Sequence, residues 1–204
     1  MHLFDQRLLG IGILFLLGLL VATKQVTTGS ILDKPRGSLL VQLVNIFNLF
    51  FLLIVNPLAA FLLITRSLET IDPTHLTISA RVLLMALEVA GLVVYVAGFL
   101  LMVWALVSLG RNYQLGGSTP RAGDHMVMVG PYRLIRHPMY TSALCISLGL
   151  TCLVQSGTFL AVFCIYLALV LPLIPMEETG LQKAYGGLYA DYQRTTKKIV
   201  PFLY

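Results

Sequence analysis

Residues 82–109 read VLLMALEVAGLVVYVAGFLLMVWALVSL, an apolar stretch in which Glu88 is the one charged residue. About 20 apolar residues are enough to cross the hydrocarbon core of a bilayer as a helix, so this stretch predicts a transmembrane helix. The whole chain has the same character: 57% of its 204 residues are hydrophobic and 11% are charged, whereas soluble domains carry about 25% charged residues. This composition predicts an all-α integral membrane protein.

Four more apolar segments predict further transmembrane helices over residues 8–22, 39–65, 140–154 and 158–174. The segment 39–65 is long enough to tilt, and Pro57 predicts a kink within it. The last two segments are separated by Gln155, Ser156 and Gly157, a connection so short that they must be antiparallel neighbours.

The first of these segments could instead be a secretory signal. Asp5 lies where a signal peptide would be basic, and no clear cleavage site follows the apolar run. Both features favour a retained helix. Five crossings are therefore expected, in a single membrane domain over residues 1–204.

The fourteen Lys and Arg residues are distributed unevenly between the two sides of such a five-helix protein. One side holds three of them, Arg7, Arg66 and Arg81. The other side holds eleven, Lys24, Lys34, Arg36, Arg111, Arg121, Arg133, Arg136, Lys183, Arg194, Lys197 and Lys198. Because basic loop residues stay on the cytoplasmic side, this asymmetry predicts an external N-terminus and a cytoplasmic C-terminus. Topology thus explains the net charge of +5, without a nucleic-acid partner.

Polar side chains recur on one face of the segment 39–65. Gln42, Asn45 and Asn48 have i, i+3, i+6 spacing, and Asn56 follows on the same face. Hydrogen bonding between helices is the simpler interpretation of this stripe, and a lining for a substrate cavity is the alternative. Glu88 has two interpretations of equal weight, a functional intramembrane carboxyl and a protonated or paired structural one.

Residues 110–142 read GRNYQLGGSTPRAGDHMVMVGPYRLIRHPMYTS and concentrate turn formers, bases and aromatic residues. Pro138 suits the first turn of the helix that follows. The backbone amides at that helix start, together with Arg136, would form a site for an anionic group, with His137 and Tyr140 beside it. The alternative is a helix start that Arg and Tyr anchor at the lipid headgroups.

Two adjacent acids, Glu177 and Glu178, follow Pro175 at the end of the fifth span. They could be dipole partners in the first turn of a helix, or they could bind a cationic or hydroxyl-rich ligand. The hairpin of the last two spans brings its ends to one face of the bilayer, so the acids are expected near His137 at the membrane surface. Three tyrosines with i, i+4, i+7 spacing predict an interfacial aromatic stripe that anchors the chain: Tyr185, Tyr189 and Tyr192.

The motif GPYRLIRHPMY at residues 130–140, with the two glutamates that follow, resembles the isoprenylcysteine carboxyl methyltransferase and phospholipid methyltransferase family of integral membrane enzymes. The resemblance covers residues 111–202 and implies a catalytic part over about 110–204. It implies direct methyl transfer from S-adenosylmethionine, with S-adenosylhomocysteine as product, to a membrane-associated lipid or prenylcysteine-like acceptor. No catalytic residue and no metal are assigned. The cofactor contacts that it implies are His125, Met126, Val127, Tyr132, Arg136, His137, Pro138, Tyr140, Glu177 and Glu178.

Two positions depart from the family pattern. Family members often have a His where this chain has Asp124, with His125 one residue later, and the eukaryotic prenylcysteine enzymes have an Arg where this chain has Leu173. The departures leave O- and N-methylation both open. The expected partners are membrane lipids and the acceptor, with no obligate protein partner, and the expected membrane is the cell membrane of a prokaryote or the endoplasmic reticulum of a eukaryote.

Two other classes of protein are alternatives. Sterol reductases have a related C-terminal architecture that binds a nicotinamide cofactor, but Gly116 and Gly117 lack the spacing of a dinucleotide-binding fingerprint. A non-enzymatic membrane protein or transporter would use the Asn stripe and Glu88 as its pathway, although no inverted repeat is visible. Cys145, Cys152 and Cys164 lie in apolar runs without zinc-ligand spacing.

Overall fold

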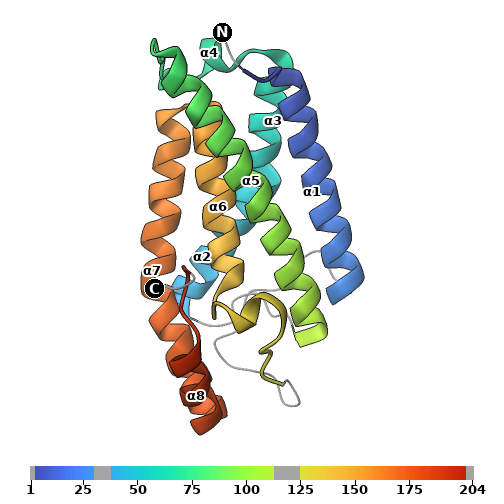
Figure 1. Ribbon diagram of the computed structural model, residues 1–204, viewed down its shortest axis with the longest axis vertical. Helices are drawn as coiled ribbons and strands as arrows, with labels where there is room; N and C mark the ends of the chain where they lie inside the picture. Colours follow the sequence, from blue (N-terminus) through green and yellow to red (C-terminus); the bar gives the residue numbers. More distant parts are fainter. Residues whose placement is uncertain (1–2, 30–37, 113–124, 201–204) are drawn as a thin grey trace.

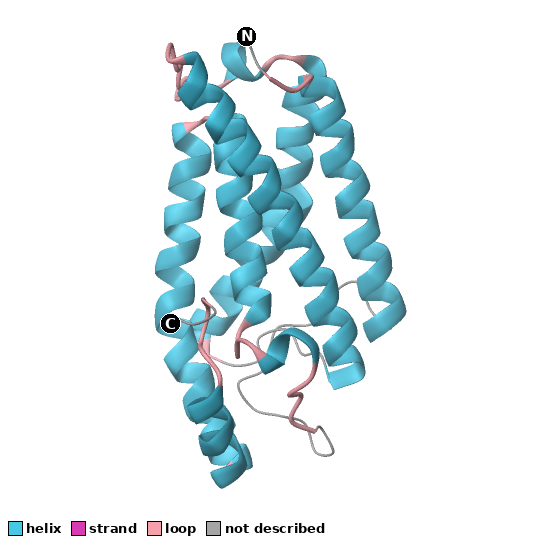
Figure 2. Ribbon diagram, viewed as in Figure 1, coloured by secondary structure: helices cyan, strands magenta, loops and turns pink. Residues whose placement is uncertain are grey.

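The structure is a computed structural model that describes residues 3–29, 38–112 and 125–200. Within these ranges the chain forms helices and no β-strand, apart from two isolated bridges (Figure 2). The α-helices are α1 (Gln6–Thr28), α2 (Leu39–Phe50), α3 (Asn56–Thr65), α4 (Leu68–Ile71), α5 (Arg81–Leu109), α6 (Pro138–Val154), α7 (Gly157–Tyr185) and α8 (Gly187–Thr195). Three shorter helical elements are η1 (Phe51–Val55), η2 (Gly110–Asn112) and η3 (Gly130–Arg133).

Five antiparallel passes make up the long bundle in Figure 1, with the start of α1 at one end and α8 at the other. Four passes are long and apolar enough to cross a membrane: Gln6–Thr28, Leu39–Thr65, Arg81–Leu109 and Gly157–Tyr185. The fifth pass, α6, has 17 apolar-rich residues and extends about 25 Å at 1.5 Å per residue, close to the minimum for a span. The predicted five-helix membrane architecture is confirmed.

The irregularity expected at Pro57 takes the form of a π-helical turn, η1, between α2 and α3. The side-chain amide of Asn56 donates to the carbonyl of Phe51 at 2.9 Å, and its oxygen accepts from the hydroxyl of Tyr95 on α5 at 2.9 Å. Asn56 is fully buried. For this member of the Asn stripe, the interpretation as a hydrogen bond between helices is correct.

Three glycines let α5 and α6 approach closely. A Cβ atom on Gly149 would lie 2.5 Å from the backbone nitrogen of Tyr95, and one on Gly98 would lie 2.8 Å from the backbone nitrogen of Ile146. Gly91 faces the backbone of Gly149 in the same way. Small residues at such crossings allow backbone packing within a bilayer, so this pair of helices positions the start of α6.

Glu88 is buried on α5 and accepts a hydrogen bond from the backbone amide of Leu3 at 2.7 Å. The carboxyl thus ties the N-terminal segment to α5, which supports its interpretation as a paired structural group. At the same end of the bundle, Arg66 after α3 pairs with Asp5 before α1 at 2.8 Å.

The last long helix differs from its prediction. The apolar run was expected to end at Ile174, with the two acids beginning a new helix, but α7 continues through Pro172 and Pro175 to Tyr185. Glu177 and Glu178 therefore lie in the body of α7, and their interpretation as dipole partners in a first turn is wrong. Lys34, Arg36, Gly116, Gly117, Arg121 and Asp124, which the sequence also singled out, are outside the described residues.

Candidate functional site

A cavity of about 320 Å³ lies among α1, α2, α5, α6, α7 and α8, at the end of the bundle where α6 begins and α7 ends. We call the polar and aromatic residues of its lining the polar part: Lys24, His125, Tyr132, Arg136, His137, Tyr140, Glu177, Tyr185, Tyr189 and Tyr192. We call a second, mostly apolar set the apolar part: Leu20, Asn45, Asn48, Leu49, Phe51, Leu52, Met102, Leu106, Ala143 and Ile146. The volume falls in the range of small-molecule sites.

The segment before α6 is held by the C-terminal segment that returns after α8. The amide of Arg136 donates to the carbonyl of Lys197 at 2.7 Å, and the amide of His137 donates to that of Lys198 at 3.0 Å. The hydroxyl of Thr141 donates to the carbonyl of Ile199 at 2.8 Å. The amides of residues 136 and 137, just before the start of α6, are therefore not available to an anion, because protein carbonyls already accept from them.

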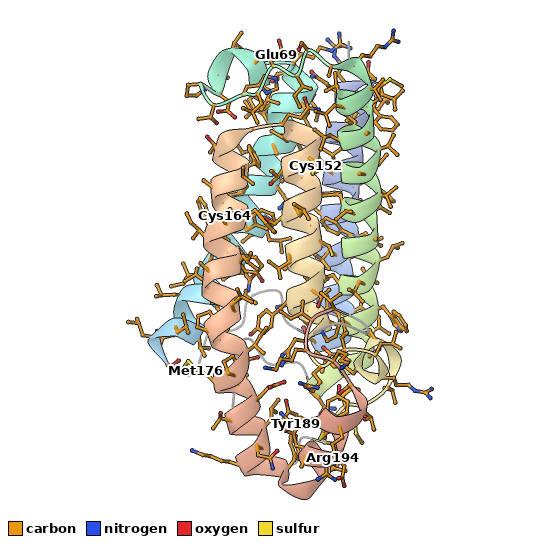
Figure 3. All side chains as sticks on the ribbon, turned by 60° about the vertical axis from the view of Figure 1, so that its left-hand side comes forward. Glu69, Cys152, Cys164, Met176, Tyr189 and Arg194 are labelled. Atoms are coloured by element: carbon orange, nitrogen blue, oxygen red, sulfur yellow. The ribbon has the colours of Figure 1, made fainter. Side chains whose placement is uncertain are left out.

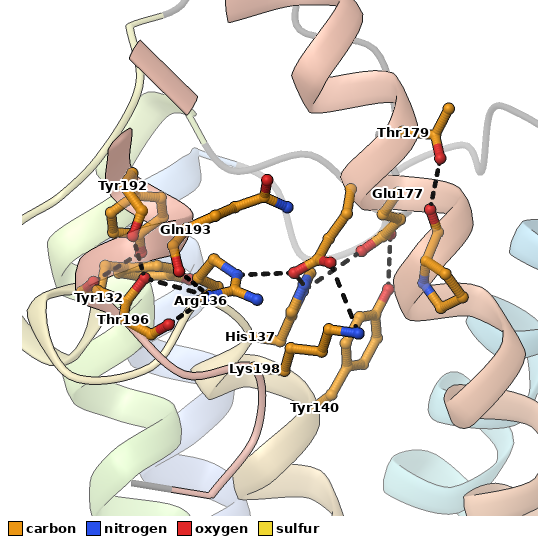
Figure 4. A network of polar contacts seen from close by, with 12 residues as sticks. Tyr132, Arg136, His137, Tyr140, Glu177, Thr179, Tyr192, Gln193, Thr196 and Lys198 are labelled. Atoms are coloured by element: carbon orange, nitrogen blue, oxygen red, sulfur yellow. Dashed lines mark hydrogen bonds and ion pairs between the residues drawn. The ribbon is translucent and has the colours of Figure 1, made fainter. Parts of the chain in front are cut away.

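Arg136 and Glu178 form a buried ion pair, which Figure 4 shows beside the site. The Nε atom of Arg136 lies 2.7 Å from Oε1 of Glu178, and Nη1 donates to the backbone carbonyls of Gln193 and Thr196. Lys198 Nζ lies 3.9 Å from the second oxygen of Glu178. Buried charges require such partners. Glu178 therefore fixes Arg136, and it connects α7 to the segment before α6 and, through Lys198, to the C-terminal segment.

His137 lies between the two acids: its Nε2 atom is 3.5 Å from Oε1 of Glu178, and Glu177 meets both His137 and Tyr140 (Figure 4). The Tyr140 hydroxyl donates to Oε1 of Glu177 at 2.7 Å, and His137 Nδ1 lies 3.8 Å from Oε2 of Glu177. The His137 and Tyr140 rings stack with centroids 5.8 Å apart. Glu177 was expected at the membrane surface but is only 9% exposed, because α7 continues past it and α8 covers that end. Glu177, His137 and Tyr140 all line the cavity.

The tyrosine stripe does not face lipid headgroups. Tyr189 and Tyr192 are buried, and both line the cavity together with Tyr185. The Tyr192 hydroxyl donates to the carbonyl of Tyr132 at 2.6 Å, while the Tyr189 hydroxyl has no hydrogen-bond partner among the described residues. Burial raises the pKa of both hydroxyls, so both stay neutral at pH 7. The prediction of an anchoring stripe was wrong, because α8 folds back under the bundle (Figure 3).

The cavity brings together most of the residues that the sequence singled out. Its lining includes His125, Met126, Val127, Tyr132, Arg136, His137, Tyr140 and Glu177. Pro138 and Glu178 lie outside the lining, since Pro138 begins α6 and Glu178 is turned toward Arg136.

Some of the residues that the sequence did not assign to the site come from the N-terminal helices. Asn45 and Asn48 of α2 line the cavity, as the alternative interpretation of the Asn stripe requires. Their i, i+3 spacing was visible in the sequence. The contact of α2 with the C-terminal helices was not. Lys24 of α1 lines the same cavity.

The arrangement offers complementary chemistry in one space. A carboxylate with a tyrosine hydroxyl, Glu177 and Tyr140, suits ammonium or hydroxyl groups, and the guanidinium of Arg136 suits an anion. Tyrosine rings suit a cation such as a sulfonium. The apolar part suits a hydrocarbon chain.

Residues 87–187 match the family described as phospholipid methyltransferase. Over 100 residues the chain is 33% identical to the cobalt-zinc-cadmium resistance protein CzcN of Cupriavidus metallidurans, which covers 48% of this chain and 46% of that protein. Over 115 residues it is 27% identical to protein-S-isoprenylcysteine O-methyltransferase B of Arabidopsis thaliana, which covers 55% of this chain and 58% of that protein. The chain thus spans about half the length of the curated relatives it matches.

A solved structure with a similar arrangement of helices is that of the eukaryotic intramembrane Ras methyltransferase ICMT, isoprenylcysteine carboxyl methyltransferase. The TM-score is 0.49 and the sequence identity is 18%, over 79% of this chain and 74% of that chain.

Proposed function

We propose, from the premise that residues 87–187 of this chain belong to the phospholipid methyltransferase family, that the protein is an S-adenosylmethionine-dependent methyltransferase that acts on a membrane-associated acceptor. The observation that carries the proposal is the cavity, in which a polar part built around His137, Tyr140 and Glu177 is continuous with an apolar part among the spans. A polar methyl donor and a lipophilic acceptor need such neighbouring environments.

The residues of the polar part fit S-adenosylmethionine group by group. The donor has a carboxylate, an amino group, ribose hydroxyls and a sulfonium. Arg136 and His137 suit the carboxylate, and Glu177 with Tyr140 suits the amino or hydroxyl groups. The rings of Tyr185, Tyr189 and Tyr192 offer faces to the sulfonium or the base. His125, Met126, Val127 and Tyr132 complete the proposed donor site, in which Glu178 acts by holding Arg136.

S-adenosylmethionine supplies an activated methyl group, and one displacement moves it to the acceptor. The chain therefore needs no covalent nucleophile. Its side chains must align the acceptor atom with the methyl group and the sulfur, and must exclude water. The C-terminal segment over residues 196–199 and α8 close the polar part from outside the bundle, which serves both tasks. We propose that this end faces the cytoplasm, where the donor is made.

The acceptor is proposed to be a lipid or prenylcysteine-like molecule, and the likeness to an isoprenylcysteine O-methyltransferase supports methyl transfer to oxygen. The test is transfer of a radiolabelled methyl group from S-adenosylmethionine to a farnesylated cysteine carboxylate or to phosphatidylethanolamine in nanodiscs. We expect incorporation into one of them. A preparation that binds NADPH and binds no S-adenosylmethionine would instead support a reductase and contradict the proposal.

A further inference from the structure

Part of the apolar lining of the cavity comes from helices outside the matched family domain. Residues 87–187 begin within α5, so α1 and α2 are not part of that domain. These two helices contribute Leu20, Asn45, Asn48 and Leu49 to the cavity, and the adjoining element η1 contributes Phe51 and Leu52. These residues would therefore recognise a feature of the acceptor that the family domain itself does not.

In this wall, Asn45 is a buried polar residue whose side-chain amide lacks a hydrogen-bond partner among the described residues. It is 4% exposed, and the atom without that partner is Nδ2. A buried amide without a partner is costly, and nearly all buried polar groups in native proteins have one. The donor therefore indicates a partner that comes from outside the chain.

The packing of α2 fixes the direction of Asn45. Val41 and Val44 are buried in an apolar cluster with Val170, Leu173 and Ile174 of α7. Farther along α2, Phe47 stacks on Tyr166 of α7 with ring centroids 5.3 Å apart. These contacts prevent rotation of α2 about its axis, so the amide of Asn45 stays in the cavity wall.

The chemistry of the wall selects the kind of partner. An N–H donor needs an atom with an available lone pair, which a hydroxyl, carbonyl or carboxylate oxygen has and a protonated amine lacks. Lys24 lines the same cavity one helical turn beyond Leu20 on α1, and its positive charge disfavours a cationic headgroup. Both observations point to oxygen rather than ammonium.

We propose that α1 and α2 form the acceptor site, and that the side-chain amide of Asn45 donates a hydrogen bond to an oxygen atom on the polar group of a long-chain amphiphile. The proposal rests on the proposed function and names its substrate class, an oxygen-bearing apolar molecule. Asn45 is then a specificity-determining residue for the acceptor, separate from the donor contacts on α6 and α7.

The test uses three twelve-carbon probes that differ only at one end: 1-dodecanol, dodecane and dodecylamine. Each competes against a diazirine-bearing dodecanol for photolabelling of the full chain in phosphatidylcholine nanodiscs, and mass spectrometry maps the labelled residues. S-adenosylhomocysteine binding is measured on the same samples. Asn45→Leu removes the amide at similar size, and Gln42→Leu, at an exposed position on the same helix, is the matched control.

We expect label on α2, and 1-dodecanol as the most potent competitor in the wild type. Asn45→Leu should cut the advantage of the alcohol over dodecane by about two- to tenfold, the value of one neutral hydrogen bond. Gln42→Leu should keep that advantage, and all variants should bind S-adenosylhomocysteine as the wild type does.

Three results would overturn the proposal: equal competition by dodecane and 1-dodecanol in the wild type, stronger competition by dodecylamine, or an unchanged preference in Asn45→Leu. Loss of S-adenosylhomocysteine binding in Asn45→Leu would also overturn it, because Asn45 would then serve the donor site or the fold. Failure of the wild type to bind S-adenosylhomocysteine is a separate result, which contradicts the proposed function.

Discussion

Glu177 and Glu178 are adjacent in the sequence, share His137 as a neighbour and otherwise have different partners in the structure. Successive helical residues are turned by about 100° from one another, so Glu177 reaches Tyr140 and the cavity while Glu178 reaches Arg136. The sequence identified the pair and its association with His137. It could not predict which of the two acids lines the cavity and which pairs with Arg136, because that depends on where α6 and the C-terminal segment lie around α7.

Glu177→Gln should weaken binding of S-adenosylhomocysteine while the protein stays folded. The amide keeps the shape of the side chain and loses the charge, and a hydrogen bond to a charged group contributes about 1.5 to 3 kcal/mol, or roughly ten- to a hundredfold in affinity. His137→Ala should act in the same direction. Calorimetry in detergent measures both.

The control for these variants is Arg194→Gln, since Arg194 is 80% exposed at its side chain and lies outside the cavity lining. Tyr189→Phe is not a suitable control, because Tyr189 lines the cavity and does not anchor the chain at the headgroups. Wild-type affinity in both Glu177→Gln and His137→Ala, with normal thermal unfolding, would show that this cluster is not the donor site.

Glu178→Gln should act mainly on stability. It leaves the buried guanidinium of Arg136 without its carboxylate, and removing one partner of a buried ion pair costs about 3 to 5 kcal/mol. The matched comparison is Asp191→Asn, which breaks the exposed pair with Arg194 and should cost at most about 1 kcal/mol. Thermal unfolding in detergent should show a clearly lower Tm for Glu178→Gln. Equal Tm values for the two variants would contradict the structural role of Glu178.

At the level of helices, apolar length was enough to predict every span, and spacing was enough to predict which residues share a face. The sequence could not predict whether such a face would meet lipid, another helix or a cavity. Tyr185, Tyr189 and Tyr192 do share a face, but α8 turns it toward the cavity rather than toward lipid. Pro175 followed the expected end of the fifth span, yet α7 continues through both Pro172 and Pro175, since neighbouring helices support interior prolines in membrane proteins.

The contact of α5 with α6 should not tolerate a methyl group at Gly149. Its Cβ would lie 2.5 Å from the backbone nitrogen of Tyr95, and backbone atoms cannot move aside as a side chain can. Overpacking of this kind costs about 1 to 3 kcal/mol, so Gly149→Ala should lower the Tm. Gly18→Ala is the control, because a Cβ there has no atom within 4 Å and alanine favours the helix. A Tm for Gly149→Ala at or above that of Gly18→Ala would show that the helices are not in close contact.

For the whole molecule, residues 87–187 match the phospholipid methyltransferase family, as the motif GPYRLIRHPMY predicted, and α1 and α2, which lie outside the matched residues, also line the cavity. The motif could predict most of the proposed donor part, because most of those residues are close in sequence. It could not predict the proposed acceptor part, because Asn45 and Leu20 reach the cavity only through packing of distant helices.

The orientation of the molecule is predicted by its charge. Eleven of the fourteen basic residues fall on the side of the C-terminus, and three fall on the other, so the C-terminal end should be cytoplasmic. A reporter fused after Tyr204 should behave as a cytoplasmic protein, and one fused before the first residue should behave as external. The reverse pattern would place the proposed donor site away from its donor.

The measurement that tests the central claim most directly is calorimetric titration of the purified, full-length protein with S-adenosylhomocysteine, without added metal and beside a parallel titration with NADPH. The polar part of the cavity supplies carboxylate, guanidinium and aromatic groups for this ligand. We predict saturable binding of S-adenosylhomocysteine below millimolar concentration and no saturable binding of NADPH. Absence of S-adenosylhomocysteine binding at millimolar concentration, in protein that unfolds cooperatively on heating, would contradict the assignment of this protein as a methyltransferase.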